Sequence, residues 1–166
     1  MEILVVLAII AIVTAGVVLS LNFSGGNSAL DTAARRLVTL LRYTRSQAQL
    51  QTRNYGILFS PHGYRFLVFS TERNQWRAVA RAEVLRPRRL PTDVSLGVRL
   101  EGRPIVLHRR RRKHPGALTP QVMIYSSGDL SSFSITLERK GTHHGFVIKP
   151  NADGRITERP LTGAAH

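Results

Sequence analysis

The stretch 1–21 constrains the fold of this chain more than any other part of the sequence. Residues 3–21 carry no charge, and the first charged residue after them is Asp31. As an α-helix rising about 1.5 Å per residue, this run is roughly 28 Å long, close to the hydrocarbon thickness of a bilayer, which is about 30 Å. Water solvates such a helix poorly, so we predict that it enters a membrane or packs against other apolar helices.

Glu2 stands at the start of this apolar run, where a carboxylate is costly to bury unless a cation meets it. In one interpretation the segment is an ordinary membrane anchor, and Glu2 stays at the interface, where the cost is small. In the other interpretation Glu2 pairs with a positive group, such as the terminal amine of a neighbouring chain. The spacing of the residues leaves both interpretations open.

The charges near the apolar run do not settle its orientation in a membrane. Arg35 and Arg36 are the nearest basic residues, and by the positive-inside rule they would place the C-terminal part in the cytoplasm. A basic leader ahead of Met1 would reverse this orientation. A cleaved secretory signal is a further alternative, although the run is long for one.

The overall composition is basic and free of cysteine, with a formal net charge of +14. Without cysteine the chain forms neither a disulfide framework nor a thiolate metal site. The excess of arginine predicts either an anionic partner, such as nucleic acid, lipid headgroups or an acidic protein, or a solvated basic surface. Basic residues are densest in the range 86–113, which includes Arg109, Arg110, Arg111, Arg112 and Lys113.

The hydrophobic pattern divides the chain into an apolar segment (1–27), an amphipathic helix (28–53) and a third part (54–166). Gly25 and Gly26 each cost about 1 kcal/mol inside a helix, so we predict a kink, a break or a flexible turn at 22–27.

The second part begins with Ser28 and Asp31, which fit a capping box at the start of a new helix. Asp31 is also spaced for a weak ion pair with Arg35. An apolar face, which we expect to cover a sheet, is formed by Leu30, Ala34, Leu37, Leu41, Thr44 and Ala48.

The third part has no helical period and consists of short β-rich runs separated by turns. We therefore predict an α+β fold: one long N-terminal helix, transmembrane in its first half and amphipathic in its second, followed by an antiparallel, sandwich-like β domain. The expected strands are residues 55–60, 64–70, 76–80, 94–100, 105–107, 122–125, 133–137, 145–149 and 155–157.

The opening sequence MEILVVLAIIAI resembles the start of mature type IV pilins and type II secretion pseudopilins. Those chains open with Phe-Thr-Leu, one apolar residue and a glutamate, to which Glu2 corresponds. Residues 124–137 (IYSSGDLSSFSITL), residues 35–53 and residues 63–66 (GYRF) are similar to the H-type minor pseudopilins and the related FimT-like pilins. In those families a basic leader ending in glycine and three mature residues come before the position of Met1. An internal Met at position 1, or a trimmed sequence, would each explain why we do not find them here.

The resemblance implies a minor pseudopilin, a structural subunit near the tip of the periplasmic pseudopilus that takes part in its assembly and in protein export. A prepilin peptidase would remove the leader and methylate the new terminus. The subunit would wait in the inner membrane as a single-pass protein, with its C-terminal domain in the periplasm. Its expected partners are membrane lipid, the major and minor pseudopilins, and secreted cargo.

In the filament, Glu2 would neutralise the terminal amine of a neighbouring subunit. The filament-core helix would pack through Ile3, Leu4, Val5, Leu7, Ile9, Ile10 and Ile12. The alternative that the resemblance leaves open is a type IV pilus minor pilin that binds DNA for uptake. That function would use an arginine-rich surface formed by Arg109, Arg110, Arg111, Arg112, Lys113, Arg155 and Arg159.

We expect no enzyme activity, metal site or cofactor. His143 and His144 are adjacent, so on a strand they point to opposite faces. Residues 151–154 resemble a calcium loop only in part, and a turn accounts for them better. Ser126, Ser127 and Asp129 lie close in sequence, but the sequence shows neither a nucleophile elbow nor a suitably placed histidine beside them.

Overall fold

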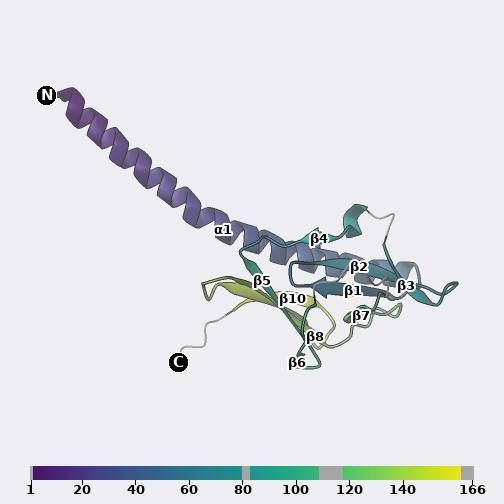
Figure 1. Ribbon diagram of the computed structural model, residues 1–166. Helices are drawn as coiled ribbons and strands as arrows, with labels where there is room; N and C mark the ends of the chain where they lie inside the picture. Colours follow the sequence, from purple (N-terminus) through teal and green to yellow (C-terminus); the bar gives the residue numbers. More distant parts are fainter. Residues whose placement is uncertain (1, 80–82, 109–117, 162–166) are drawn as a thin grey trace.

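The computed structural model describes residues 2–79, 83–108 and 118–161, without the side chains of residues 2–5, 7–9 and 11–27. A single long helix, α1 (Glu2–Leu50), comes before ten strands in two antiparallel sheets, which confirms the predicted α+β class (Figure 1). The first sheet contains β1 (Tyr55–Ser60), β2 (Gly63–Ser70), β3 (Gln75–Ala78), β4 (Arg88–Arg89) and β7 (Val122–Ile124). The second contains β5 (Val94–Leu100), β6 (Arg103–Pro104), β8 (Phe133–Arg139), β9 (Gly145–Pro150) and β10 (Ile156–Pro160).

Helix α1 continues through residues 22–27, so the predicted break or turn there is wrong, as is the capping box at Ser28. Gly25 and Gly26 lower helix stability, but extending a helix that already exists on both sides avoids a new nucleation step, the costly part of helix formation. Asp31 is therefore an interior residue. Its basic neighbour is His144, whose Nε2 lies 3.8 Å from Asp31 Oδ1 and forms an ion pair with it only when the imidazole is protonated; within the described residues no ion pair with Arg35 is found.

Among the residues whose side chains the structure describes, no helical segment is long and apolar enough to cross a membrane. The predicted membrane-spanning run, residues 3–21, lies almost wholly outside those residues. Its membrane insertion therefore remains a prediction.

The C-terminal half of α1 packs on the β domain through the face that the sequence predicts. Leu30, Ala34 and Leu37 have no exposed surface, and neither have Leu41, Thr44 and Ala48. Thr44 is tolerated there because its Oγ1 donates to the carbonyl oxygen of Leu40 at 2.7 Å. Val38 and Leu40 are also buried and widen the face.

Two arginines fasten the polar edge of this helical segment to the domain. Arg42 Nε and Nη2 donate to the carbonyl oxygen of Ile156 at 3.1 and 2.7 Å. Arg45 donates through Nε to the Gly128 carbonyl and through Nη1 to the Gly154 carbonyl, both at 2.6 Å. Since hydrogen bonds from a charged donor contribute about 1.5–3 kcal/mol each, these contacts fix the helix against β10 and against the turns that contain Gly128 and Gly154.

The two sheets share one hydrophobic core with the helix. In the first sheet the strand order is β3-β2-β1-β7, with β4 also paired to β2; in the second it is β10-β9-β8-β5-β6. The largest buried side chains come from both sheets and include Ile57, Phe59, Phe66, Ile124, Ile135, Leu137, Ile148 and Ile156.

Most predicted strands are confirmed within a few residues, and the differences lie where the chain is irregular. The predicted strand 105–107 is wrong: β6 is only Arg103–Pro104, and the Ile105 amide donates to the Val98 carbonyl at 3.0 Å. The 3-10 helix η1 (Glu83–Leu85) and the short strand β4 were not predicted, because neither is long enough to show a period in the sequence.

Truncating the helix face should destabilise the whole β domain. We expect Leu41→Ala to lower the free energy of unfolding by about 2–5 kcal/mol, because the cavity it leaves is walled by the shared core. Leu50→Ala on the same helix is the control, since Leu50 is 76% exposed and should change stability by less than about 0.5 kcal/mol. Urea unfolding of the full chain in detergent measures both; equal effects would contradict the packing described here.

Candidate functional site

The N-terminal half of α1 projects away from the β domain (Figure 1). Glu2 is the first residue of the helix, but its side chain lies outside the described residues, as do those of Ile3, Leu4, Val5, Leu7, Ile9 and Ile12. Two apolar side chains described in this half, Val6 and Ile10, are 54% and 56% exposed.

The predicted anion-binding residues are described only in part. Arg109, Arg110, Arg111, Arg112 and Lys113 lie outside the described residues. The structure therefore does not show whether they approach Arg155 and Arg159.

Arg155 and Arg159 are both exposed. Arg155 directly precedes β10, and Arg159 lies near the C-terminal end of that strand. The side chain of Arg155 is 83% exposed, and its Nε lies 3.4 Å from Asp153 Oδ2. Arg155 shares a hollow of about 540 Å³ with Arg42 and Arg45. Because those two guanidinium groups bind backbone carbonyls, their charges hold the helix in place.

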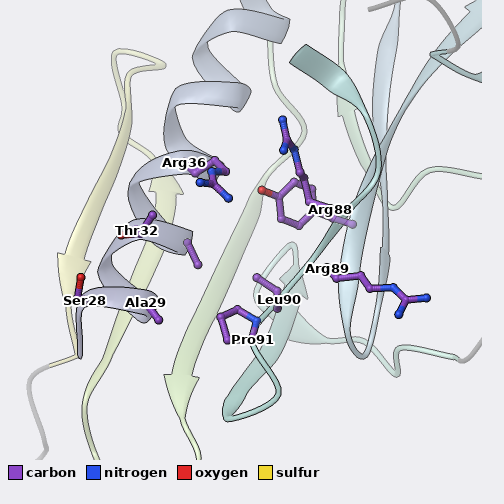
Figure 2. A pocket seen from close by; sticks show the side chains of 10 residues that line it. Ser28, Ala29, Thr32, Arg36, Arg88, Arg89, Leu90 and Pro91 are labelled. Atoms are coloured by element: carbon purple, nitrogen blue, oxygen red, sulfur yellow. The ribbon is translucent and has the colours of Figure 1, made fainter. Parts of the chain in front are cut away.

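A different basic cluster, which the sequence analysis did not identify, lies between α1 and β4. Three arginines and a tyrosine line a hollow of about 500 Å³, here called the α1–β4 hollow. Arg36 on the helix and Arg88 on the strand lie on opposite walls, whereas Arg89 extends along the outer side of β4 (Figure 2). The remaining lining residues are Ser28, Ala29, Thr32, Ala33, Tyr64, Leu90 and Pro91.

Burial governs the chemistry of Tyr64 in this hollow. Tyr64 is only 4% exposed, and this burial raises its pKa to about 12, while the charges of Arg88 and Arg36 act in the opposite direction. The phenol therefore keeps its proton at physiological pH and can donate a hydrogen bond.

The cationic side chains of the hollow have no carboxylate partner within the described part of the chain. The ion pairs within the described residues all lie elsewhere: Arg139–Asp93, Arg155–Asp153 and, when the imidazole is protonated, His144–Asp31. Arg88 Nη2 donates to the Val84 carbonyl at 3.3 Å, but its Nε is buried without a hydrogen-bond partner. A buried donor left unpaired costs about 1–3 kcal/mol, so this strand carries a cost that the rest of the fold offsets.

The sequence contains a signal for half of this cluster. Arg88 and Arg89 stand between Pro87 and Pro91 within the basic range 86–113, which indicates a stiff, positively charged segment. Nothing local in the sequence brings Arg36 near them, since that proximity depends on how the helix packs on the β domain.

The histidines and acidic residues in the described ranges form no group of three or more that could hold a metal ion. Residues 151–154 form the turn that was expected: the Gly154 amide donates to the Asn151 carbonyl at 2.9 Å. Ser127 Oγ donates to Asp129 Oδ2 at 2.8 Å, a local contact within another turn.

Comparisons with known proteins agree on one family. The model of the family described as type II transport protein GspH matches residues 33–154. The chain is 32% identical over 156 residues to type II secretion system protein H of Pseudomonas aeruginosa, covering 92% of this chain and 88% of the relative. It is 28% identical over 162 residues to the protein of the same name from Aeromonas hydrophila, covering 94% and 88%.

Two solved structures share the fold. The crystal structure of the minor pseudopilin EPSH from the type II secretion system of Vibrio cholerae matches with a TM-score of 0.71 and 14% identity, covering 83% of this chain and 100% of that one. The solution structure of E. coli GspH matches with a TM-score of 0.60 and 17% identity, covering 85% and 94%.

Tyr64 predicts a loss of stability at high pH. The unfolded chain releases this proton near the ordinary pKa of 10.0 and the folded chain near 12. The contribution of Tyr64 is therefore constant below pH 10 and falls between about pH 10 and pH 12, by up to about 1.4 kcal/mol per pH unit.

Urea unfolding near pH 7, 9 and 11 measures this effect. Tyr64→Phe keeps the ring without the acid and should lose less stability than the unchanged protein between pH 9 and pH 11. Tyr125→Phe, at a 41% exposed site, is the control and should follow the unchanged protein. Parallel pH profiles for all three proteins would show that burial of Tyr64 has no such effect.

Proposed function

Because the chain belongs to the GspH family of type II transport proteins and is a minor pseudopilin of the type II secretion system, we propose that α1 moves from the inner membrane into the core of a filament. The observation that carries this proposal is the single helix Glu2–Leu50, of which only the C-terminal half is packed on the β domain. The projecting half is then available to lipid first and to the helices of other subunits afterwards.

The exchange of environments is energetically feasible. Lipid tails are as apolar as leucine side chains, so replacing lipid by other apolar helices changes little hydrophobic free energy. Close packing and polar contacts between helices then decide whether the subunit leaves the membrane. In this proposal the β domain stays in the periplasm throughout, joined rigidly to the moving helix.

Glu2 supplies the polar contact in this proposal. A carboxylate at the end of the apolar run would pair with the terminal amine of a neighbouring subunit, where a low dielectric makes the attraction strong and sensitive to distance. The pair would form only at one axial offset between two helices, so Glu2 would set their register.

The subunit's other partners follow from the same assembly. A prepilin peptidase would act on the precursor, the major and other minor pseudopilins would surround the helix, and the β domain near the tip would contact secreted cargo. The basic charge of the domain, within a chain of net charge +14, favours acidic surfaces on those partners.

The charge on Glu2 is tested by Glu2→Gln, which keeps the size of the side chain. We expect the variant to reach the inner membrane at unchanged levels, because one polar group at the end of the run costs little. Cross-linking to other pseudopilins, and secretion of the system's substrates, should each fall by about tenfold or more, since about 1.4 kcal/mol changes an equilibrium tenfold. Glu72→Gln, on the exposed turn after β2, is the matched control. Normal assembly of Glu2→Gln would rule out the pairing role.

The DNA-binding alternative is tested by the mobility of duplex DNA with the full chain in detergent. For a secretion subunit we expect no stable complex near physiological salt. Binding that is tight, salt-sensitive and lost when Arg109, Arg110, Arg111 and Arg112 become Ser would instead assign the chain to DNA uptake, because phosphate contacts depend steeply on salt.

A further inference from the structure

The α1–β4 hollow has the properties of an anion-binding site. Arg36 and Arg88 stand on its opposite walls, Arg89 borders it, and no lining residue is acidic (Figure 2). Like charges gathered in this way repel one another. An anion in the hollow would relieve this repulsion.

The strand that carries two of these arginines is held firmly. β4 pairs with β2 through Gly63 opposite Arg89 and Tyr64 opposite Arg88. A side chain at position 63 would overlap the carbonyl oxygen of Arg88, so Gly63 permits the close approach. The Leu90 amide donates to the His62 carbonyl at 3.0 Å.

Hydrophobic contacts anchor the same segment from both ends. Leu85 in η1 and Leu90 after β4 are 2% and 8% exposed, and both belong to the shared core. The guanidinium groups of β4 are therefore presented on a preorganised backbone, which lowers the entropic cost of binding a ligand.

The position of the hollow along α1 distinguishes between two sources of the anion, a lipid headgroup and a neighbouring subunit. At about 1.5 Å per residue, Arg36 lies roughly 22 Å beyond Leu21, the end of the apolar run. The headgroup layer on each side of a bilayer is only about 5–8 Å thick. A lipid phosphate is therefore too far from Arg36 when residues 3–21 span the membrane.

A subunit whose helix packs alongside α1 can contact the hollow, because the hollow borders α1 at the point where the helix leaves the domain. A second copy of this chain is a poor partner, since both copies would carry a net charge of +14. A carboxylate fits the guanidinium fork of arginine in a bidentate way, and the protonated Tyr64 can donate to it as well.

We propose that the α1–β4 hollow receives an aspartate or glutamate side chain from a different, neighbouring pseudopilin, which inserts between Arg36 and Arg88. This inference rests on the proposed function and adds a contact between β domains to the contact between helices. It makes the arginines of the hollow a determinant of which subunit sits beside this one.

The test places a photo-cross-linking amino acid at Thr32, an exposed residue lining the hollow, in the full chain expressed with the other pseudopilins of its system. We expect an adduct with another pseudopilin, mapped to an acidic segment. Arg36→Gln should lower its yield by about tenfold, and so should Arg88→Gln. Arg35→Gln is the matched control, because Arg35 is exposed one position away and does not line the hollow. Arg36 is also exposed, so its variant tests the charge without disturbing the core.

A second cross-linker at Val6 reports on the helix independently. If Val6 forms adducts and Thr32 forms none, this inference is overturned and the proposed function stands. The same holds if Val6 forms adducts and the yield of the Thr32 adduct is unchanged by Arg36→Gln. A lipid adduct at Thr32 would overturn it in favour of a headgroup site. Loss of adducts at both positions would overturn the inference and the proposed function together.

Discussion

The burial of one face of α1 in the β domain is the interaction on which the rest of the structure depends. The buried face, from Leu30 to Ala48, closes a core to which both sheets contribute, and without it the inner side chains of β1, β8 and β10 would face water. The same contact converts a membrane-length helix and a separate β domain into one body. Any force on the N-terminal half of the helix is therefore felt by the sheets.

Arginine plays two separate roles along this helix. Arg42 and Arg45 donate hydrogen bonds to backbone carbonyls of the domain, so their role is to hold the helix on the domain. Arg36, about two turns earlier, lines a hollow without a carboxylate. Net charge alone does not separate these roles, since only the surroundings of each guanidinium group decide whether its charge remains available to a partner.

The helix face and most strands could be predicted because their signals are local and periodic. The 3.6-residue pattern of Leu30, Ala34 and Leu37, and the alternation in β5, are consequences of burial on one side. The break expected at Gly25 and Gly26 was wrong because propensity is a small term beside the cooperativity of a helix present on both sides. β4 and the α1–β4 hollow were beyond reach, because β4 depends on its pairing with β2 and the hollow brings Arg36 near residues far away in sequence.

The continuity of α1 has a geometric consequence for any assembly built from such subunits. In an α-helix each residue adds about 1.5 Å along the axis and about 100° around it. If the rod slips past a neighbour by one residue, equivalent packing is regained only after a matching turn. The axial position of the helix and its rotation about its own axis are therefore linked. A contact near the N-terminus that fixes one of them also determines which side of the β domain faces the next subunit.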